Sequence, residues 1–171
     1  KAIEKQNPGL SNRIVMGPWF HGGWHRAEGS HLGDVGFGSH TSEFYQDGVE
    51  IPFFERHLRE HVKTDSIAEA TDFFTGENRW KKFDRWPPPA MKPVPIFLRE
   101  EEKLSYEKPG SNEQPAVYVS DPRKPVPFSP DIPLTRNREY MIADQRFAAR
   151  RPDVLVFSTE ALDGDIVLAG P

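Results

Sequence analysis

The sequence predicts an α/β segment followed by an all-β segment. Residues 14–16 form a continuous apolar strand that ends at Gly17-Pro18, and a helical pattern follows between about residues 41 and 63. Most of the 17 prolines lie after residue 86, among short apolar runs separated by turn residues. Continuous apolar strands are typical of parallel sheets, and short strands with regular turns are typical of sandwiches. We therefore expect an α/β region over residues 1–66 and a β-sandwich over residues 67–171.

The composition excludes several classes of protein. The 171 residues are 36% apolar and 28% charged, which is typical of a globular chain, and the net charge of -4 gives no electrostatic basis for nucleic-acid binding. No apolar run reaches the roughly 18 residues that a membrane span needs, and no signal peptide is visible. The absence of cysteine excludes disulfides, thiolate metal sites and a cysteine nucleophile.

The first elements follow from turn residues and apolar spacing. A turn cluster at residues 8–12 precedes the strand at 14–16, and residues 17–41 carry many glycines without any period, which predicts a long functional loop. The helix from residue 41 has possible cap residues at Ser39, Thr41 and Ser42 and an apolar face formed by Ile51, Phe54, Leu58 and Val62. Gly48 and Pro52 predict a kink or a short break in this helix.

The second half reads as strands joined by turns. Thr64-Asp65-Ser66 is the best candidate for the domain boundary. Residues 70–75 and 79–83 predict a hairpin, because Gly76-Glu77-Asn78 closes the first run. Further strands are expected at residues 94–99, 104–106, 116–120, 154–158 and 166–168. These are fewer strands than an eight-stranded jelly roll needs, so we expect only its first part.

His21 is the candidate catalytic residue. It follows the strand on a loop between Trp19 and Trp24 and is backed by Gly22-Gly23. A histidine after a late strand fits the general base of a Ser-His-Asp triad, since α/β-hydrolases carry the three residues in the order serine, acid, histidine. The chain has no Gly-x-Ser-x-Gly elbow, so it cannot complete a triad. The alternative is a structural or surface histidine, and the two tryptophans would either line an acyl pocket or pack the loop.

A metal site is the weaker chemical hypothesis. The candidate ligands are His21, His25, His31 and His40. The spacing of the first two matches one helical turn, but Gly22-Gly23 disfavours a helix between them, and the motif of zinc proteases is missing. His57 and His61 lie one turn apart but would need a third ligand. We expect no metal and no cofactor.

Several motifs together resemble one enzyme family. Residues 17–23, Gly-Pro-Trp-Phe-His-Gly-Gly, resemble the histidine motif of the X-prolyl dipeptidyl-peptidase and cocaine esterase family, which includes α-amino acid ester hydrolases and glutaryl-7-aminocephalosporanic acid acylases. The similarity is greatest to the acylase and amino acid ester hydrolase branch. It continues through residues 32–35, 53–58, 80–87, 119–127, 144–146, 151–155 and 169–171.

The resemblance implies a fold and a division of roles. It implies that residues 1–66 are the end of an α/β-hydrolase domain, with His21 as the catalytic histidine, and that residues 67–171 are the first part of a jelly roll. The nucleophilic serine and the aspartate would lie in the remainder of the same polypeptide, and the substrate would be a small amide or ester. Many relatives are exported, which favours a periplasmic or secreted protein over a cytoplasmic one, and the family is compatible with a homo-oligomer. The rival hypothesis is a non-catalytic jelly-roll module that binds carbohydrate or protein.

Overall fold

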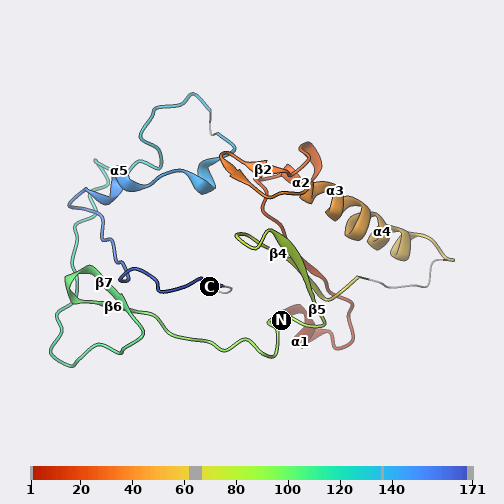
Figure 1. The fold of residues 1–171 in the computed structure, drawn as a ribbon, viewed down its shortest axis with the longest axis horizontal. Helices are drawn as coiled ribbons and strands as arrows, with labels where there is room; N and C mark the ends of the chain where they lie inside the picture. The colour runs from red at the N-terminus through yellow and green to blue at the C-terminus, as the bar shows by residue number, and fades with distance from the viewer. Residues whose placement is uncertain (1, 62–66, 136, 169–171) are drawn as a thin grey trace. The chain divides into compact units, whose positions relative to one another are not determined.

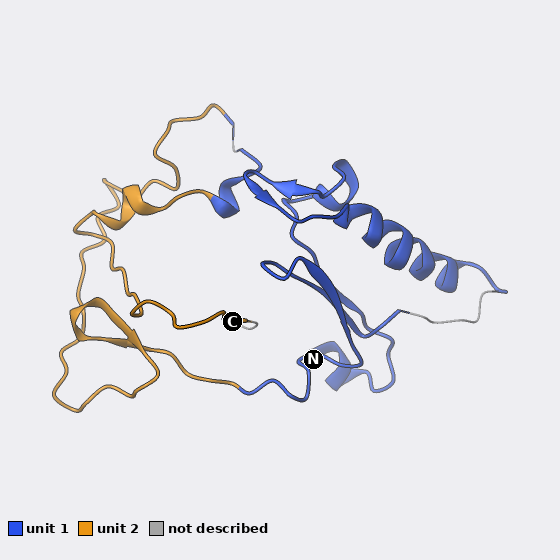
Figure 2. Cartoon of the chain, viewed as in Figure 1, with its two compact units in different colours: residues 1–92, 135–142 blue, residues 93–134, 143–171 orange. Residues whose placement is uncertain are grey.

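The computed structural model describes residues 2–61, 67–135 and 137–168 (Figure 1). The chain divides into two compact units, which Figure 2 colours separately. Unit 1 contains residues 1–92 and 135–142, and unit 2 contains residues 93–134 and 143–171. The boundary cluster that the sequence suggested, Thr64-Asp65-Ser66, lies outside the described residues.

A three-stranded sheet forms the centre of unit 1. Its strands are β1 (Ile14–Met16), β4 (Ala70–Phe74) and β5 (Arg79–Phe83), in the order β1-β4-β5. β1 is parallel to β4, and β4 is antiparallel to β5. The β4–β5 turn uses positive φ angles at Gly76 (86°) and Asn78 (51°), residue types that tolerate this conformation. The predicted hairpin is therefore confirmed, with its first strand one residue shorter.

The pairing of β1 with β4 changes the predicted division of the chain. The sequence assigned everything after residue 66 to the second domain, but Ile14 lies opposite Ala70 and Met16 lies opposite Asp72. Because β4 completes the sheet that β1 begins, residues up to 92 belong to the first compact unit. A parallel ladder joins segments far apart in the chain, and local turn residues do not reveal it.

β1 is less covered than its sequence suggested. The continuous apolar run predicted burial on both faces, yet Ile14 and Val15 are only half-buried and Met16 is 55% exposed. Within the described part of the chain, β1 is an edge strand that pairs with β4 alone. β4 has the central place, and four of its five residues are buried.

Short elements replace the irregular loop predicted for residues 17–41. They are the helix α2 (Gly23–Arg26) and the two-stranded hairpin of β2 (His31–Leu32) and β3 (Val35–Gly36); a further short helix, α1 (Ala2–Gln6), precedes β1. These short elements are stabilised by the burial of apolar side chains from the segment. Leu32 and Phe37 are 7% and 2% exposed, and with Phe73 of β4 they form the buried apolar cluster, against which Phe20 and Trp80 pack.

The predicted helix is present as one continuous helical run with a wide turn inside it. It consists of α3 (Thr41–Tyr45), the π-helical turn η1 (Gln46–Glu50) and α4 (Ile51–Leu58). The kink or short break expected at Gly48 and Pro52 takes the form of this π-helical turn, which contains Gly48 and directly precedes the Pro52 segment, while Gln46, Glu50 and Ile51 keep helical angles. A π-turn lengthens the backbone spacing where proline cannot donate a hydrogen bond and its ring would crowd the preceding turn. The helix ends at Leu58, earlier than predicted, and no helix among the described residues could span a membrane.

Unit 2 contains little regular structure among its described residues. A hairpin joins β6 (Phe97–Arg99) to β7 (Lys103–Ser105) through the 3-10 turn η2 (Glu100–Glu102). One isolated bridge connects Lys103 to Ser158. The short helix α5 (Arg146–Ala149) also belongs to this unit, whereas the 3-10 turn η3 (Tyr140–Ile142) belongs to unit 1.

Three strands predicted for the sandwich are not formed as ladders. Residues 116–120 and 166–168 carry no strand, and residues 154–158 contribute only the bridge at Ser158. The apolar side chains of the first two segments are exposed: Val117 by 80%, Val119 by 74% and Leu168 by 73%. A strand is stabilised by a paired neighbour and a covered face, and the described residues supply neither here. The jelly roll remains a prediction.

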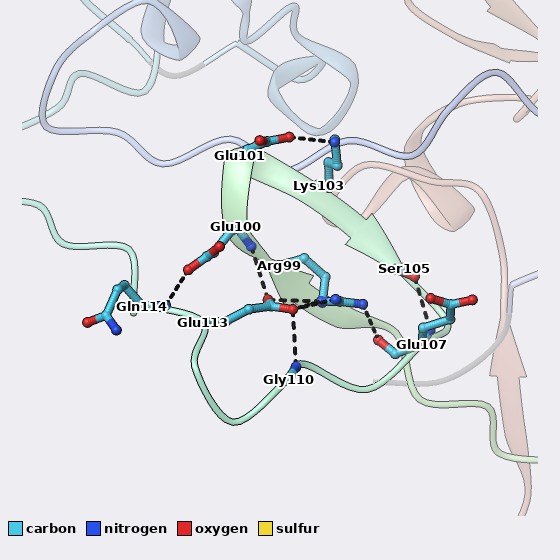
Figure 3. A network of polar contacts seen from close by, with 9 residues as sticks. All are labelled: Arg99, Glu100, Glu101, Lys103, Ser105, Glu107, Gly110, Glu113 and Gln114. Atoms are coloured by element: carbon cyan, nitrogen blue, oxygen red, sulfur yellow. Dashed lines mark hydrogen bonds and ion pairs between the residues drawn. The ribbon is translucent and has the colours of Figure 1, made fainter.

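A carboxylate closes the loop beside the β6–β7 hairpin (Figure 3). Glu113 accepts hydrogen bonds from the Arg99 guanidinium, from the Gly110 amide at 3.1 Å and from the Glu100 amide at 3.4 Å. The Arg99 hydrogen bonds, and then that of Gly110, lower the pKa of Glu113 to about 2. The network ties the loop of residues 107–114 to the end of β6.

Candidate active site

His21 lies just beyond the carboxyl end of β1, on the turn that leads into α2. Figure 1 shows α2 beside β2 and the start of α3, on the side of unit 1 from which the long helix runs. The carboxyl ends of parallel strands are where α/β folds place reactive groups. The predicted position of His21, after a strand and on a glycine-containing loop, is thus the position it has in the structure.

The histidine occupies a defined turn. The Gly23 amide donates to the Phe20 carbonyl at 2.8 Å, so residues 20–23 form a β-turn with His21 second and Gly22 third. Gly22 has φ 78° and ψ 8°, and His21 has no positive φ, which is the pattern of a type II turn. The third position of that turn requires a positive φ, which explains why glycine follows the histidine.

Two further glycines, one before the turn and one at its end, make room for aromatic rings. A Cβ on Gly17 would lie 2.2 Å from the Trp19 ring, so the indole lies directly against this backbone. A Cβ on Gly23 would lie 3.0 Å from Trp19 Cβ and 3.2 Å from the Phe20 ring. The motif's glycines therefore allow the histidine turn to pack closely on its own tryptophan and phenylalanine.

Trp19 is the central packing residue beneath the turn. Its ring lies 5.2 Å from Tyr45, 5.8 Å from Trp80 and 6.3 Å from Trp24, and its Nε1 donates to Thr41 Oγ1 at 2.8 Å. Such ring pairs and a satisfied indole N–H are the usual marks of a buried anchor. Of the two roles that the sequence left open, these contacts favour loop packing for Trp19.

Trp24 lies nearer the histidine. Its ring meets the His21 imidazole edge to face, with 6.3 Å between centroids and 81° between planes. It is half-buried, whereas His21 is exposed. Trp24 thus forms one wall beside the imidazole, a position from which it could also contact a bound molecule.

The His21 imidazole makes no hydrogen bond or ion pair with the described part of the chain. Two other histidines use their ring nitrogens within the chain: His40 contacts Glu43 and Glu28 at 3.1 and 3.8 Å, and His31 contacts Ser30. Within the described ranges, no three His, Asp or Glu side chains are grouped closely enough to hold a metal ion. Both nitrogens of His21 are therefore open to groups outside these ranges.

One buried acid was not singled out by sequence reasoning. Asp72 of β4 lies opposite Met16 at the end of β1, is 5% exposed, and has no hydrogen-bond partner for either carboxylate oxygen among the described residues. Burial raises its pKa, and the nearby Met16 backbone opposes this rise. The signal in the sequence was a lone acid inside an apolar strand, Ala-Thr-Asp-Phe-Phe.

Two cavities of the described chain lie apart from the histidine. Cavities of about 400 Å³ and 490 Å³ lie in unit 2, lined among others by Arg99 and Glu113 in the first and by Tyr118 and Asp153 in the second. Neither is lined by His21, Trp19 or Trp24. The candidate site is an exposed imidazole on a hydrogen-bonded turn, with the Trp24 ring beside it.

Comparison with known proteins places these features in context. No protein-family model matches the chain. It is 30% identical to the cocaine esterase of Rhodococcus sp. (strain MB1 Bresler), in an alignment that covers 92% of this chain and 29% of the esterase. Its fold is similar to the crystal structure of an aminopeptidase from a marine sediment Thaumarchaeota archaeon, with a TM-score of 0.76 and 35% sequence identity. It is also similar to the structure of an α-amino acid ester hydrolase, with a TM-score of 0.74 and 33% sequence identity.

Both structural matches cover 94% of this chain and 27% of the longer protein. The chain thus spans less than a third of the length of these relatives. The match runs through both compact units, and the sequence motifs from the Gly-Pro-Trp-Phe-His-Gly-Gly run onward had indicated the same relatives. Over this partial region, the resemblance to the X-prolyl dipeptidyl-peptidase and cocaine esterase family that the motifs indicated is confirmed, because the chain is similar to a cocaine esterase and to an α-amino acid ester hydrolase.

Proposed function

We propose that this chain contributes the catalytic histidine of a serine acyl-hydrolase, which cleaves an amide or ester through an acyl-enzyme. One observation carries the proposal: His21 projects from a type II turn at the carboxyl end of a parallel strand, and its imidazole has no partner among the described residues. A buried structural histidine would use its nitrogens within the fold, and the place of His21 after the parallel strand distinguishes it from an exposed helix residue such as His25.

His21 acts in this proposal as general base and then as general acid. It accepts the hydroxyl proton of a serine as that oxygen attacks the substrate carbonyl carbon, and it returns the proton to the leaving group as the acyl-enzyme forms. One ring nitrogen faces the serine, and the other donates to a carboxylate that orients the ring. A ring that is held in one orientation lowers the entropic cost of reaching the reactive geometry, both in acylation and in deacylation.

The serine and the aspartate belong, in this proposal, to the remainder of the same polypeptide. The chain contains no Gly-x-Ser-x-Gly elbow, and Asp34, the nearest acid on the loop, follows the histidine. In α/β-hydrolases the serine and the acid precede the histidine, so both are assigned to the amino-terminal side. Asp72 is not given this role, because it lies within β4, downstream of His21.

The substrate class comes from the relatives and from one side chain. The relatives are named for a cocaine ester, for amino acid esters and for aminopeptidase action, which share an acyl group bound to oxygen or nitrogen. We assign Trp24 as the apolar contact for that acyl compound, because its ring lies beside the imidazole. The hydrogen bond and ring contacts of Trp19 support a packing role instead.

The test is substitution of the histidine in the full-length polypeptide. We expect His21→Ala to lower kcat for hydrolysis of an activated ester by about three to four powers of ten or more, as in other triads, with the fold retained. His25→Ala is the matched control, because His25 is exposed on α2 and its side chain has no partner among the described residues. We expect that control to keep kcat within about twofold.

Two results would contradict the proposal. A His21→Ala protein that hydrolyses the ester within tenfold of the unmodified protein would exclude a general-base role. The same conclusion would follow if a serine-directed fluorophosphonate labelled the unmodified and His21→Ala proteins at equal rates, since labelling requires the activated hydroxyl.

A further inference from the structure

Three side chains of the helical run of residues 41–58 form hydrogen bonds with the loop around His21. Gln46 Nε2 donates to the Trp24 carbonyl at 2.7 Å, and Ser42 Oγ donates to the Gly23 carbonyl at 3.2 Å. Thr41 Oγ1 accepts from Trp19 Nε1 at 2.8 Å and donates to the Gly29 carbonyl at 2.6 Å. The segments immediately before and after His21 are therefore both bonded to the same helix.

The two hydroxyl groups do not serve their own helix. Ser and Thr at a helix start normally cap its free amides, and the sequence predicted that role for Thr41 and Ser42. The structure instead has His40 at the N-cap, without a side-chain cap bond. Both hydroxyls are fully buried, at 0% exposure, and both contact carbonyls of the loop that carries α2. The two hydroxyls therefore do not cap the amides of their own helix, and they donate instead to carbonyls of the preceding loop.

Gln46 lies at a second irregularity of the helix. The π-turn η1 begins at this residue, and the Ile51 amide donates to the Gln46 carbonyl across five residues. A π-turn changes the direction in which side chains leave the helix on either side of it, and such turns occur frequently at functional sites. Here the half-buried Gln46 amide meets the carbonyl of Trp24, the residue whose ring lies against the imidazole.

We propose that Ser42 and Gln46 are positioning residues for His21. They bind consecutive carbonyls, that of Gly23, the last residue of the type II turn, and that of Trp24, which follows it. Because these two carbonyls are bonded to the helix, the backbone at the carboxyl-terminal end of the turn is held in one orientation, and the Trp24 ring stays beside the imidazole. Neither side chain touches a reacting atom; each acts through the backbone of the turn.

This inference rests on the proposed function, and its test uses the full-length polypeptide. Gln46→Met keeps the length of the side chain and removes the donor, and Ser42→Ala removes the hydroxyl without adding volume. The matched control is Asp47→Ala, on the same helical turn, exposed and without a described partner. The rate of ester hydrolysis is measured as kcat per active site, with sites counted from the end point of acylation by an irreversible serine reagent.

We expect each of the two variants to lower kcat per titrated site by about three- to tenfold, which is the usual value of one net hydrogen bond, with KM changed less than about twofold. Asp47→Ala should match the unmodified protein in both quantities. A role limited to folding would reduce the number of titrated sites and leave kcat per site unchanged, and that result would overturn the inference.

The His21→Ala protein separates the two proposals. If it is inactive while Gln46→Met and Ser42→Ala keep full kcat per site, the positioning role fails and the triad assignment stands. If His21→Ala itself keeps its activity, the proposed function fails, and the helix contacts then have no catalytic consequence.

Discussion

Replacing Gly17 with alanine would place a methyl group inside the ring of Trp19. An ideal Cβ on Gly17 lies 2.2 Å from Cζ3, 2.3 Å from Cη2 and 2.5 Å from Cε3 of that indole. Real Cβ atoms do not approach other atoms this closely, so either the ring or the strand end must move. The turn that carries His21 starts only three residues later, and it would move with them.

The cost follows from what holds the indole. Overpacking of this kind costs about 1–3 kcal/mol. A ring that moves away to relieve it also loses the hydrogen bond to Thr41, worth about 0.5–1.5 kcal/mol, and weakens its contacts with Tyr45 and Trp80. We expect Gly17→Ala to lower the free energy of unfolding by about 2–4 kcal/mol.

Gly48→Ala supplies a control with the opposite sign. Gly48 lies within the helical run, and a Cβ there would meet nothing within 4 Å. Alanine should therefore raise the free energy of unfolding by about 0.5–1 kcal/mol. Urea denaturation of the full-length polypeptide, followed by circular dichroism, measures both changes. Equal effects of the two substitutions, or a neutral Gly17→Ala, would refute the packing of Trp19 against the Gly17 backbone.

Two further predictions concern ionisable groups. The pKa of Glu113 is about 2 in the folded chain against an ordinary 4.5, so its bonds to Arg99 and Gly110 stabilise the fold above pH 4.5, and this stability is lost as the pH falls toward 2. Thermal denaturation of Glu113→Gln should show a lower Tm than the unmodified protein at pH 7 and a gap that narrows below pH 4.5; a constant gap would contradict the network. The pKa of Asp72 is raised by burial, so its ionised form destabilises the fold at pH values above the ordinary 3.8, and the cost reaches its full size above the raised pKa. Asp72→Asn should therefore raise Tm at pH 7 and have little effect near pH 3; a lower Tm at pH 7 would show that the carboxylate has a partner elsewhere in the full-length polypeptide.

The parts of unit 1 that depend on local chemistry could be predicted from the sequence. The hairpin of β4 and β5 followed from its apolar runs and from Gly76 and Asn78, which supply the positive φ angles of its turn. The place of His21 after β1, on a glycine-containing loop, was also predicted, and the structure adds that the glycine occupies the third position of a type II turn. In each case residues within a few positions of one another determine the conformation.

The parts that depend on distant contacts could not be predicted in this way. The parallel pairing of β1 with β4 has no local signal, so turn residues near 64–66 suggested a domain boundary instead. β2 and β3 have two residues each, and their stability comes from the burial of Leu32 and Phe37 against Phe73 rather than from strand propensity.

The candidate site likewise combines features that local sequence predicts with features that depend on distant contacts. Ser and Thr at a helix start usually cap it, and only the folded arrangement reveals that Thr41 and Ser42 bind the carbonyls of another segment. In unit 2, the apolar pattern of residues 116–120 predicted a strand, but a strand also needs a paired edge, which the pattern cannot supply.

The order in which this unit can be assembled follows from its sheet. The histidine turn and the helix that binds it come from residues 20–58, but Trp80, against which the Trp19 and Phe44 rings pack, comes from β5. A chain emerging from the ribosome therefore presents the turn before its support exists. Closing the ladder between β1 and β4 must bring together ends that the whole helix separates, and contacts of this kind form late and slowly. Until then Trp19 lacks its packing against Trp80, and transiently exposed apolar surface of this kind favours aggregation.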